Sequence, residues 1–168
     1  MQTKEYVFVD RTGWPSGEWD NEPDKVQWPD AETGLPCIAR RNSHAGNWCG
    51  YVGVSEGHPL YGKHYDIPDL TVHGGLTFSR ACVDSDDEHG ICHVPSAGEP
   101  DHVWWFGFDC AHCYDFSPID ILRAKSGYPF TIMADEKYRT LAYVKNQCTA
   151  LARQLAAIRT DVQRSAVE

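Results

Sequence analysis

The sequence lacks a hydrophobic run that could cross a bilayer, which takes about 20 consecutive apolar residues, and it lacks an excess of basic residues. It has 15 Lys and Arg residues against 24 Asp and Glu residues, and its formal net charge is −9 at pH 7. A protein that holds nucleic acid by neutralising phosphates needs a basic surface. The composition therefore argues against a membrane protein and against binding of a nucleic-acid polymer.

The first residues, MQTKEYVFVDRTG, also lack the basic start and apolar stretch of a secretory signal. We therefore expect a cytoplasmic protein. In that reducing compartment the seven cysteines should be thiols, some buried and some on a metal. Their odd number agrees with this expectation, because a disulfide framework uses an even number. A chain of 168 residues is long enough for one domain with a single core.

Short runs typical of β-strands recur along the chain, separated by turn-forming Gly, Pro, Asn and Asp residues. The expected strands are KEYVFVD (4–10), LPCIAR (35–40), NWCGYVGV (47–54), LTVHGGLTFS (70–79) and VWWFGFD (103–109). Residues 1–45 are an aromatic N-terminal part, in which residues 13–34 are expected to form a long loop. The polar residues 84–101 are expected to form an exposed excursion from the sheet, between two central strands. The close spacing of the strands predicts antiparallel pairing.

The C-terminal part has a helical pattern instead. Apolar residues at alternating spacings of 3 and 4 predict one amphipathic helix over residues 136–160. These residues are Leu141, Val144, Cys148, Leu151, Leu155 and Ile158. The fold prediction is α+β: a single domain (1–168) in which an antiparallel β-sheet packs against this long helix and long irregular loops connect the strands.

Two expected strands each combine an apolar face with a face that carries a glycine and polar groups. In 103–109, Trp105, Gly107 and Asp109 alternate with the apolar residues that should form the core. In 70–79 the corresponding polar face carries His73, Gly75 and Thr77. A strand glycine often marks close approach of a ligand. We therefore predict a shallow site floored by the two glycines, with the other four residues around it.

The segment DCAHCYD, which follows the second of these strands, permits three interpretations. The first is a catalytic site for a divalent metal, zinc above all, with manganese and iron as further candidates. Its ligands would be His73, Asp109, His112 and Asp115. His73, Asp109 and Asp115 are the candidate catalytic residues, and one of the two carboxylates would accept a proton from metal-bound water.

The second interpretation is a structural zinc site with four thiolate ligands. The ligands would be Cys82, Cys92, Cys110 and Cys113. In either version Cys82 and Cys92 should lie within about 4 Å of each other, as a shared metal or a disulfide requires. The third interpretation is a redox dithiol made by Cys110 and Cys113.

The loop EGHPLYGKHYD could close over a substrate, with Lys63 facing an anionic group. This loop and the polar strand face together provide the set of candidate substrate-binding residues. Among them, the indole of Trp105 could stack on a ring of the substrate if it is exposed. This set is His58, Lys63, Thr77 and Trp105.

Three motifs carry a resemblance to other proteins: HGGLTF, CHVPSAGEPDHVWWFGFDCAH and YRTLAYVKNQCTALARQLA. At these motifs the sequence resembles a family of uncharacterised proteins of bacteriophages and bacterial genomes, over most of the chain from Cys49 to Ile158. The resemblance implies a phage or prophage origin and a setting in the bacterial cytoplasm. It implies no activity and transfers no functional residue.

Two functions follow as expectations. The first is a metal-dependent hydrolase that acts on a small polar substrate, of which a nucleotide is one candidate. The alternative is a phage binding protein without catalysis, which captures a host protein or a small signalling molecule.

Overall fold

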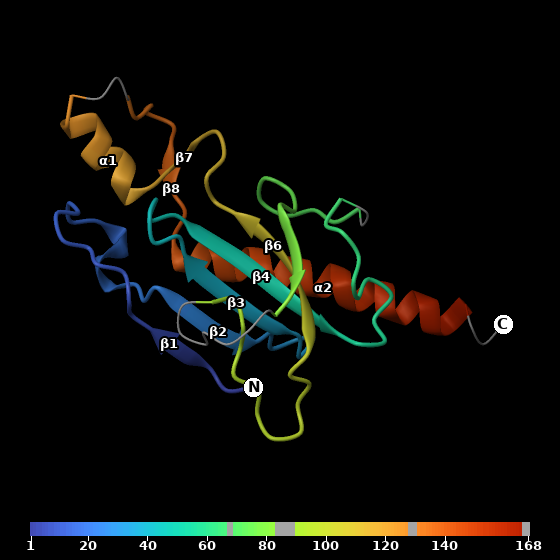
Figure 1. Ribbon diagram of the computed structural model, residues 1–168. Coiled ribbons are helices and arrows are strands. Elements are labelled where there is room, and N and C mark those ends of the chain that lie inside the picture. The colour runs from blue at the N-terminus through green and yellow to red at the C-terminus, as the bar shows by residue number, and fades with distance from the viewer. Residues whose placement is uncertain (67–68, 83–89, 128–130, 166–168) are drawn as a thin grey trace.

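The computed structural model describes residues 1–66, 69–82, 90–127 and 131–165. Its main feature is a six-stranded antiparallel sheet with a long C-terminal helix across one face, so the predicted α+β class is confirmed (Figure 1). The strands follow the spatial order β1 (Lys4–Tyr6), β2 (Lys25–Pro29), β3 (Pro36–Arg41), β4 (Trp48–Ser55), β6 (Val103–Asp109) and β5 (Phe78–Ala81).

The remaining elements lie mostly in the C-terminal part. They are the 3-10 helix η1 (Glu18–Asn21), α1 (Pro118–Lys125), the two short parallel strands β7 (Asp115–Phe116) and β8 (Lys137–Tyr138), and α2 (Leu141–Ser165). None of the helices in the described part of the chain has the length and apolar character that a bilayer span needs.

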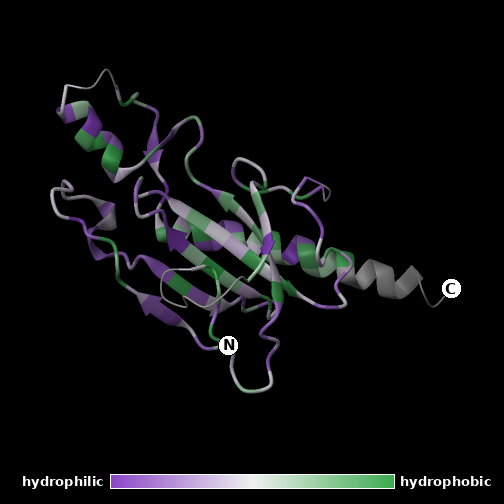
Figure 2. Cartoon of the chain, viewed as in Figure 1, coloured by the Kyte–Doolittle hydropathy of each residue, from purple (hydrophilic) through white to green (hydrophobic). Residues whose placement is uncertain are grey.

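The main core lies between the sheet and α2, which runs behind the sheet in Figure 1. The strand alternation predicted for residues 103–109 is confirmed on this face, because Phe106 and Phe108 are buried against the apolar stripe of the helix. Cys148 is fully buried in that stripe, as predicted. Figure 2 shows hydrophobic residues in the central strands and a hydrophilic β1 at the sheet edge.

The other face of the sheet carries a second, smaller core. It contains Ile38, Tyr51, Val103 and Trp105, with Cys82 and Ile91 packed against them. The prediction that Trp105 faces a ligand is therefore wrong: its side chain is fully buried, because residues that follow β5 in the chain cover this face.

Several predicted elements differ from the structure. The strand predicted over residues 4–10 ends at Tyr6, and the helix predicted over residues 136–160 begins at Leu141. Strand β2 lies inside the predicted loop 13–34; its Lys25 and Gln27 are fully buried polar residues, which hide the apolar alternation of a strand. The predicted strand 70–79 is wrong for most of its length, because β5 begins only at Phe78. Gly74 and Gly75 have φ angles of 65° and 84°, and this left-handed backbone makes a turn instead of a strand.

Cys82 and Cys92 form a disulfide, with a Cα–Cα distance of 5.2 Å. This confirms that the two sulfurs lie together, and it corrects the expectation that all the cysteines are thiols. It also overturns the four-thiolate zinc site, because two of the four proposed ligands are bonded to each other. Cys92 and His93 are buried, so the predicted exposed excursion is wrong there, while residues 83–89 lie outside the described residues.

The start of α2 is fixed by the partly buried carboxylate of Glu22. Its Oε1 accepts a hydrogen bond of 2.6 Å from the Leu141 backbone N–H. Its Oε2 accepts hydrogen bonds from Arg41 at 2.9 Å, from the Trp48 indole at 3.0 Å and from the Tyr138 hydroxyl. A carboxylate is a favourable partner for the unsatisfied N–H groups at a helix start. The contacts hold β8 and the first turn of α2 against the sheet, next to the candidate site.

Candidate functional site

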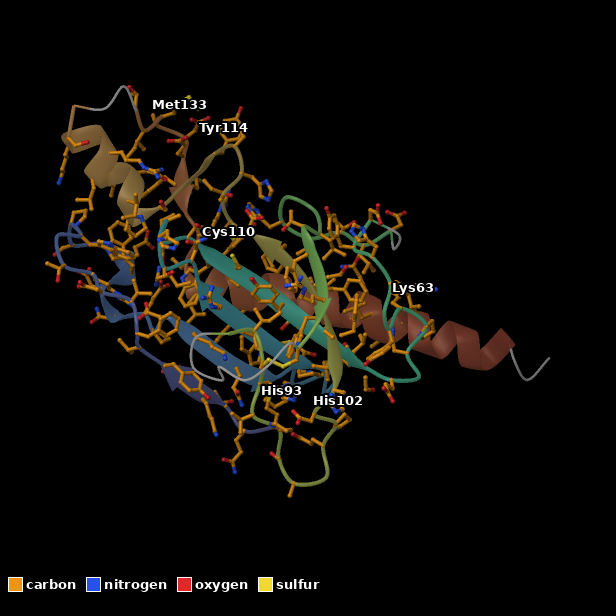
Figure 3. All side chains as sticks on the ribbon, viewed as in Figure 1. Lys63, His93, His102, Cys110, Tyr114 and Met133 are labelled. Carbon is orange, nitrogen blue, oxygen red and sulfur yellow. A yellow bond between two sulfur atoms is a disulfide. The ribbon has the colours of Figure 1, made fainter. Side chains whose placement is uncertain are left out.

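Four of the predicted site residues come together where β6 ends. They are His73, Asp109, His112 and Asp115, and they lie on the turn at 72–75, the end of β6, the loop at 110–114 and β7. Figure 3 labels Cys110 and Tyr114 at this end of the molecule. The four residues form two His–Asp pairs, which we call the inner pair (His73 and Asp115) and the outer pair (His112 and Asp109).

The inner pair is buried and saturated with hydrogen bonds. The distance from His73 Nε2 to Asp115 Oδ2 is 2.7 Å, and the side chains are 12% and 1% exposed. Arg139 Nε donates to Asp115 Oδ1 at 2.6 Å, and the His112 backbone N–H donates to Oδ2 at 3.1 Å. Asp115 therefore ties the loop at 110–114 and the turn at 72–75 to the segment that precedes α2.

Helix α2 supplies two further partners of His73. The Tyr143 hydroxyl lies 2.9 Å from His73 Nδ1, and Gln147 Oε1 accepts a 2.9 Å hydrogen bond from the His73 backbone N–H. Residues four apart lie on one helix face, so both side chains reach the same turn. When neutral His73 donates its Nε2–H to Asp115, its Nδ1 accepts a hydrogen bond from the Tyr143 hydroxyl.

The charges around Asp115 explain its protonation state. Burial alone would raise the pKa of this carboxyl, but hydrogen bonds from Arg139, His73 and the His112 backbone outweigh burial and lower the pKa below its ordinary value. The pKa of Tyr143 is raised, mainly by burial, although the Arg139 guanidinium opposes the shift. Asp115 is thus an anion and Tyr143 a protonated donor near neutral pH.

The outer pair is more open and less tightly bonded. His112 Nε2 lies 3.5 Å from Asp109 Oδ1, and the two side chains are 33% and 30% exposed. Asp109 also accepts hydrogen bonds from the Thr77 hydroxyl at 2.9 Å and the Ala111 backbone N–H at 3.1 Å. Thr77 therefore lies beside Asp109 as a partner of the carboxylate, and its role in substrate binding stays a prediction. The His73 and His112 ring centroids are 5.7 Å apart.

Gly74 brings the two pairs close together. A Cβ atom at this position would lie 2.1 Å from ring atoms of His112, and the φ angle of 65° also favours glycine. The predicted floor of Gly75 and Gly107 is wrong. A Cβ at Gly107 would meet the Tyr51 ring at 2.4 Å, so Tyr51 covers this glycine, and Gly75 belongs to the turn.

Tyr114 is a feature of the site that the sequence did not reveal. It is the one non-glycine residue with a positive φ (71°) in the described part of the chain, and its side chain is 51% exposed. Its carbonyl accepts a 2.9 Å hydrogen bond from the Lys137 N–H, and the next residue, Asp115, pairs with Lys137. The strained backbone turns the chain so that Asp115 points inward while Tyr114 points to solvent.

The other predicted substrate-binding residues lie elsewhere. His58 is buried, with its Nε2 2.9 Å from the Leu155 carbonyl and its Nδ1 accepting the Leu60 N–H at 3.1 Å, so its role is to anchor the loop. Lys63 is exposed and lies far from Cys110 in Figure 3. Its carbonyl accepts the Trp104 indole N–H at 2.9 Å, at the opposite end of β6 from Asp109. Neither residue contributes to the site in this conformation.

The redox interpretation of Cys110 and Cys113 finds no support in the geometry. Both are free thiols, and Cys110 is buried whereas Cys113 is exposed. Burial, with smaller contributions from Asp115, Cys49 and Asp109, raises the pKa of Cys110 far above its ordinary value. A reactive cysteine needs the opposite shift, because its thiolate is the nucleophile.

A four-ligand metal site does not fit the inner pair as it stands, because both oxygens of Asp115 already hold hydrogen bonds from Arg139 and His73. In the described ranges no group of three or more His, Cys, Asp or Glu side chains is arranged to hold a metal ion. His112 Nε2 is buried and has no hydrogen-bond partner there. The metal site stays a prediction, centred on His112 and Asp109.

Arg139, Tyr143 and Gln147 are the members of the site that sequence reasoning missed. Tyr143 and Gln147 have a weak signal in the sequence, because polar residues on the flank of an amphipathic helix usually face solvent. Arg139 lies in the short segment between β8 and α2, outside the helix. The chain was compared with protein-family models, with curated proteins and with solved structures, and none of them matches it.

Proposed function

We propose that this protein is a hydrolase of a small polar substrate, in which His112 accepts a proton from water and Asp109 stabilises the resulting imidazolium. The observation that carries the proposal is the outer pair itself: an imidazole that solvent reaches, with a carboxylate 3.5 Å behind it. A His–carboxylate pair of this kind is a common general base.

The reaction would use the side chains as follows. His112 Nδ1 takes one proton from a water molecule, whose oxygen attacks the electrophilic carbon or phosphorus of the substrate. The bond to the leaving group breaks, and His112 returns the proton to that group. No hydrogen bond joins His112 Nδ1 to another described residue, so this nitrogen can accept the proton.

The inner pair would position this base without contacting the substrate. Asp115 accepts the His112 backbone N–H, and the ring of His112 packs against the backbone of Gly74, next to His73. Two contacts on different elements therefore fix the imidazole. Pre-organisation of this kind reduces the cost of orienting a catalytic group during the reaction.

The exposed ring of Tyr114 supports a substrate with a planar or apolar part, such as a nucleotide. Tyr114 takes the role that the sequence suggested for Trp105, because it is exposed and precedes Asp115 in the chain. An exposed aromatic ring beside polar groups is typical of a site that binds one flat group and orients one polar group.

The test compares hydrolysis of p-nitrophenyl acetate, bis(p-nitrophenyl) phosphate and a panel of nucleotides by the wild-type protein and by His112→Gln. A lost general base should lower kcat/KM by about 100-fold or more. Cys113→Ser is the matched control, since Cys113 is the exposed neighbour of His112 and should be dispensable. Full activity in His112→Gln would overturn the assignment of the base. Ligand binding without any turnover would favour the non-catalytic binding protein.

A divalent metal bound to His112 Nε2 is the alternative to the general-base mechanism, because a nitrogen that binds a metal cannot carry the proton that Asp109 would stabilise. This nitrogen is buried, faces Asp109 Oδ1 and has no hydrogen-bond partner among the described residues. Zinc takes imidazole nitrogen and carboxylate oxygen as ligands. Calorimetric titration with zinc should then show one site that both His112→Gln and Asp109→Asn abolish. Equal zinc binding by the wild type and both variants would remove the metal from the proposal.

A further inference from the structure

Residues 91–94 cross the face of the sheet opposite α2, and we call this segment the strap. Cys92 and His93 are each 4% exposed, and Ile91 packs on the second core with Tyr51 and Trp105. Figure 3 labels His93 at the end of the molecule away from Tyr114 and Met133. The strap is therefore remote from the His–Asp pairs and needs an explanation of its own.

Polar contacts from β2 hold the backbone of the strap. Lys25 Nζ donates a 2.8 Å hydrogen bond to the Cys92 carbonyl. The Gln27 amide makes a two-way contact with Val94, donating to its carbonyl at 3.1 Å and accepting from its N–H at 2.9 Å. Lys25 and Gln27 are both fully buried. Buried polar groups of this kind require partners, and the strap supplies them.

The disulfide fixes one end of the strap to the sheet. The Cys82 N–H donates to the Val103 carbonyl at 3.3 Å, so Cys82 lies directly after β5 and beside β6. The bond to Cys92 then keeps the strap within 5.2 Å of that position, measured between Cα atoms. Cys82 is only partly buried, whereas Cys92 is 4% exposed, so Cys82 is the less buried half of the disulfide.

The closed strap covers the indole N–H of Trp105. The Trp105 Nε1–H is buried and has no hydrogen-bond acceptor among the described residues, and the His93 ring packs edge-on to the indole with centroids 5.5 Å apart. A buried donor without an acceptor disfavours the state that buries it. Opening of the strap would let water reach this N–H, and the disulfide opposes that opening.

We propose that the Cys82–Cys92 disulfide is a redox-controlled latch that holds the strap over the sheet. A dithiol reductant attacks the disulfide, and the two thiols of the reductant become a disulfide. The S–S bond breaks, and Cys82 and Cys92 each gain one electron and one proton. The freed strap then separates from β2 and uncovers Lys25, Gln27 and Trp105, while the sheet and α2 stay folded.

The test is amide hydrogen exchange of the full-length protein before and after reduction with dithiothreitol. The reporter is the Val94 amide, which donates to Gln27 across the strap contact, and the control is the Val52 amide in the central strand β4. The disulfide closes a loop between Cys82 and Cys92, which are 10 positions apart in the sequence, and reduction removes this constraint. We expect the Val94 amide to exchange roughly 100-fold faster, as loop-closure entropy predicts for such a span, and the Val52 amide to keep its rate.

The double variant Cys82→Ser, Cys92→Ser should behave without reductant as the reduced wild type does, and Cys113→Ser, which leaves the bond intact, should behave as the oxidised wild type. Faster exchange at Val94 and Val52 together would overturn the latch, because the bond would then stabilise the whole fold. An unchanged Val94 rate would overturn it as well, as would labelling of Cys82 and Cys92 by a thiol reagent in air-oxidised protein.

Discussion

The inner and outer His–Asp pairs use the same residue types for different purposes. His73 and Asp115 are 2.7 Å apart and almost wholly buried, with partners from the turn, the loop at 110–114 and α2. His112 and Asp109 are 3.5 Å apart and about one-third exposed. A polar group whose bonds are all made within the protein stabilises the fold, whereas one with a free lone pair facing solvent can react. The comparison is the basis for our proposal that the inner pair stabilises the fold and the outer pair takes part in the reaction.

The largest expected effect is that of Asp115→Asn, which removes the charge that Arg139 and His73 share. Breaking a buried pair leaves an uncompensated group, and we expect a loss of about 3 kcal/mol in the free energy of unfolding. Asp109→Asn is the matched variant in the outer pair and should cost less than about 1 kcal/mol. Urea denaturation measures both values. Equal losses would erase the distinction between the pairs.

Acid should weaken the inner pair through Asp115. Its folded-state pKa is lowered, so between that value and the unfolded value of about 3.9 the unfolded chain binds more protons. The contribution of Asp115 to stability is complete above about pH 4 and is lost as the pH falls through the folded pKa. Denaturation curves from about pH 6 to about pH 3 should show the gap between wild type and Asp115→Asn narrowing toward acid. A constant gap would contradict the assignment.

Gly74→Ala should disturb the contact between the pairs. The left-handed backbone alone costs about 1–2 kcal/mol for alanine, and the new Cβ would also displace the His112 ring. Gly75→Ala is the matched control, because its φ is also positive but a Cβ there meets no atom within 4 Å. We expect a larger loss of stability, and shifted His112 ring resonances in NMR spectra, for Gly74→Ala only. Identical behaviour of the two variants would show that the ring contact is unimportant.

Tyr143→Phe should have the smallest effect, a loss of about 1 kcal/mol for one hydrogen bond. The phenyl ring keeps the packing against Arg139, whose Cζ lies 4.9 Å from the ring centroid. A double-mutant cycle with Asp115→Asn measures whether the hydroxyl acts through His73. Additive losses would mean that Tyr143 and Asp115 act independently. The Tyr143 hydroxyl would then not strengthen the contact between His73 and Asp115.

The parts of the fold that repeat a local pattern could be predicted from the sequence. The 3- and 4-residue spacings of apolar residues predicted the C-terminal helix α2. The alternation in residues 103–109 identified the side of β6 that faces this helix. The burial of side chains on the face of the sheet opposite α2 could not be predicted in the same way. Trp105 is buried there by the strap, a segment without regular periodicity whose position depends on a disulfide and on two buried polar side chains of β2.

Four residues of the candidate site could be predicted from the sequence, but their arrangement in space could not. The cluster of acids and histidines near the end of β6 pointed to His73, Asp109, His112 and Asp115, and these residues do meet. Their arrangement depends on a positive φ at Tyr114 and on a close approach at Gly74, both of which are set by tertiary contacts. The helix residue Tyr143 could not be assigned before the rotation of α2 against the sheet was known, and Arg139 lies in the irregular segment between β8 and α2.

The pairing of β4 with β6 has a consequence for the speed of folding. These central neighbours pair along the whole of β6, from Cys49 with Asp109 to Ser55 with Val103. A long stretch of chain separates them, whereas β3 and β4 are joined by a short turn. Contacts between distant segments require the entropy of loop closure to be lost before they stabilise the fold, which slows folding. We therefore expect the β3–β4 hairpin to form early and the β4–β6 ladder to limit the refolding rate. An intact Cys82–Cys92 bond lies inside that loop and shortens the chain to be ordered, so the oxidised protein should refold faster than the reduced one.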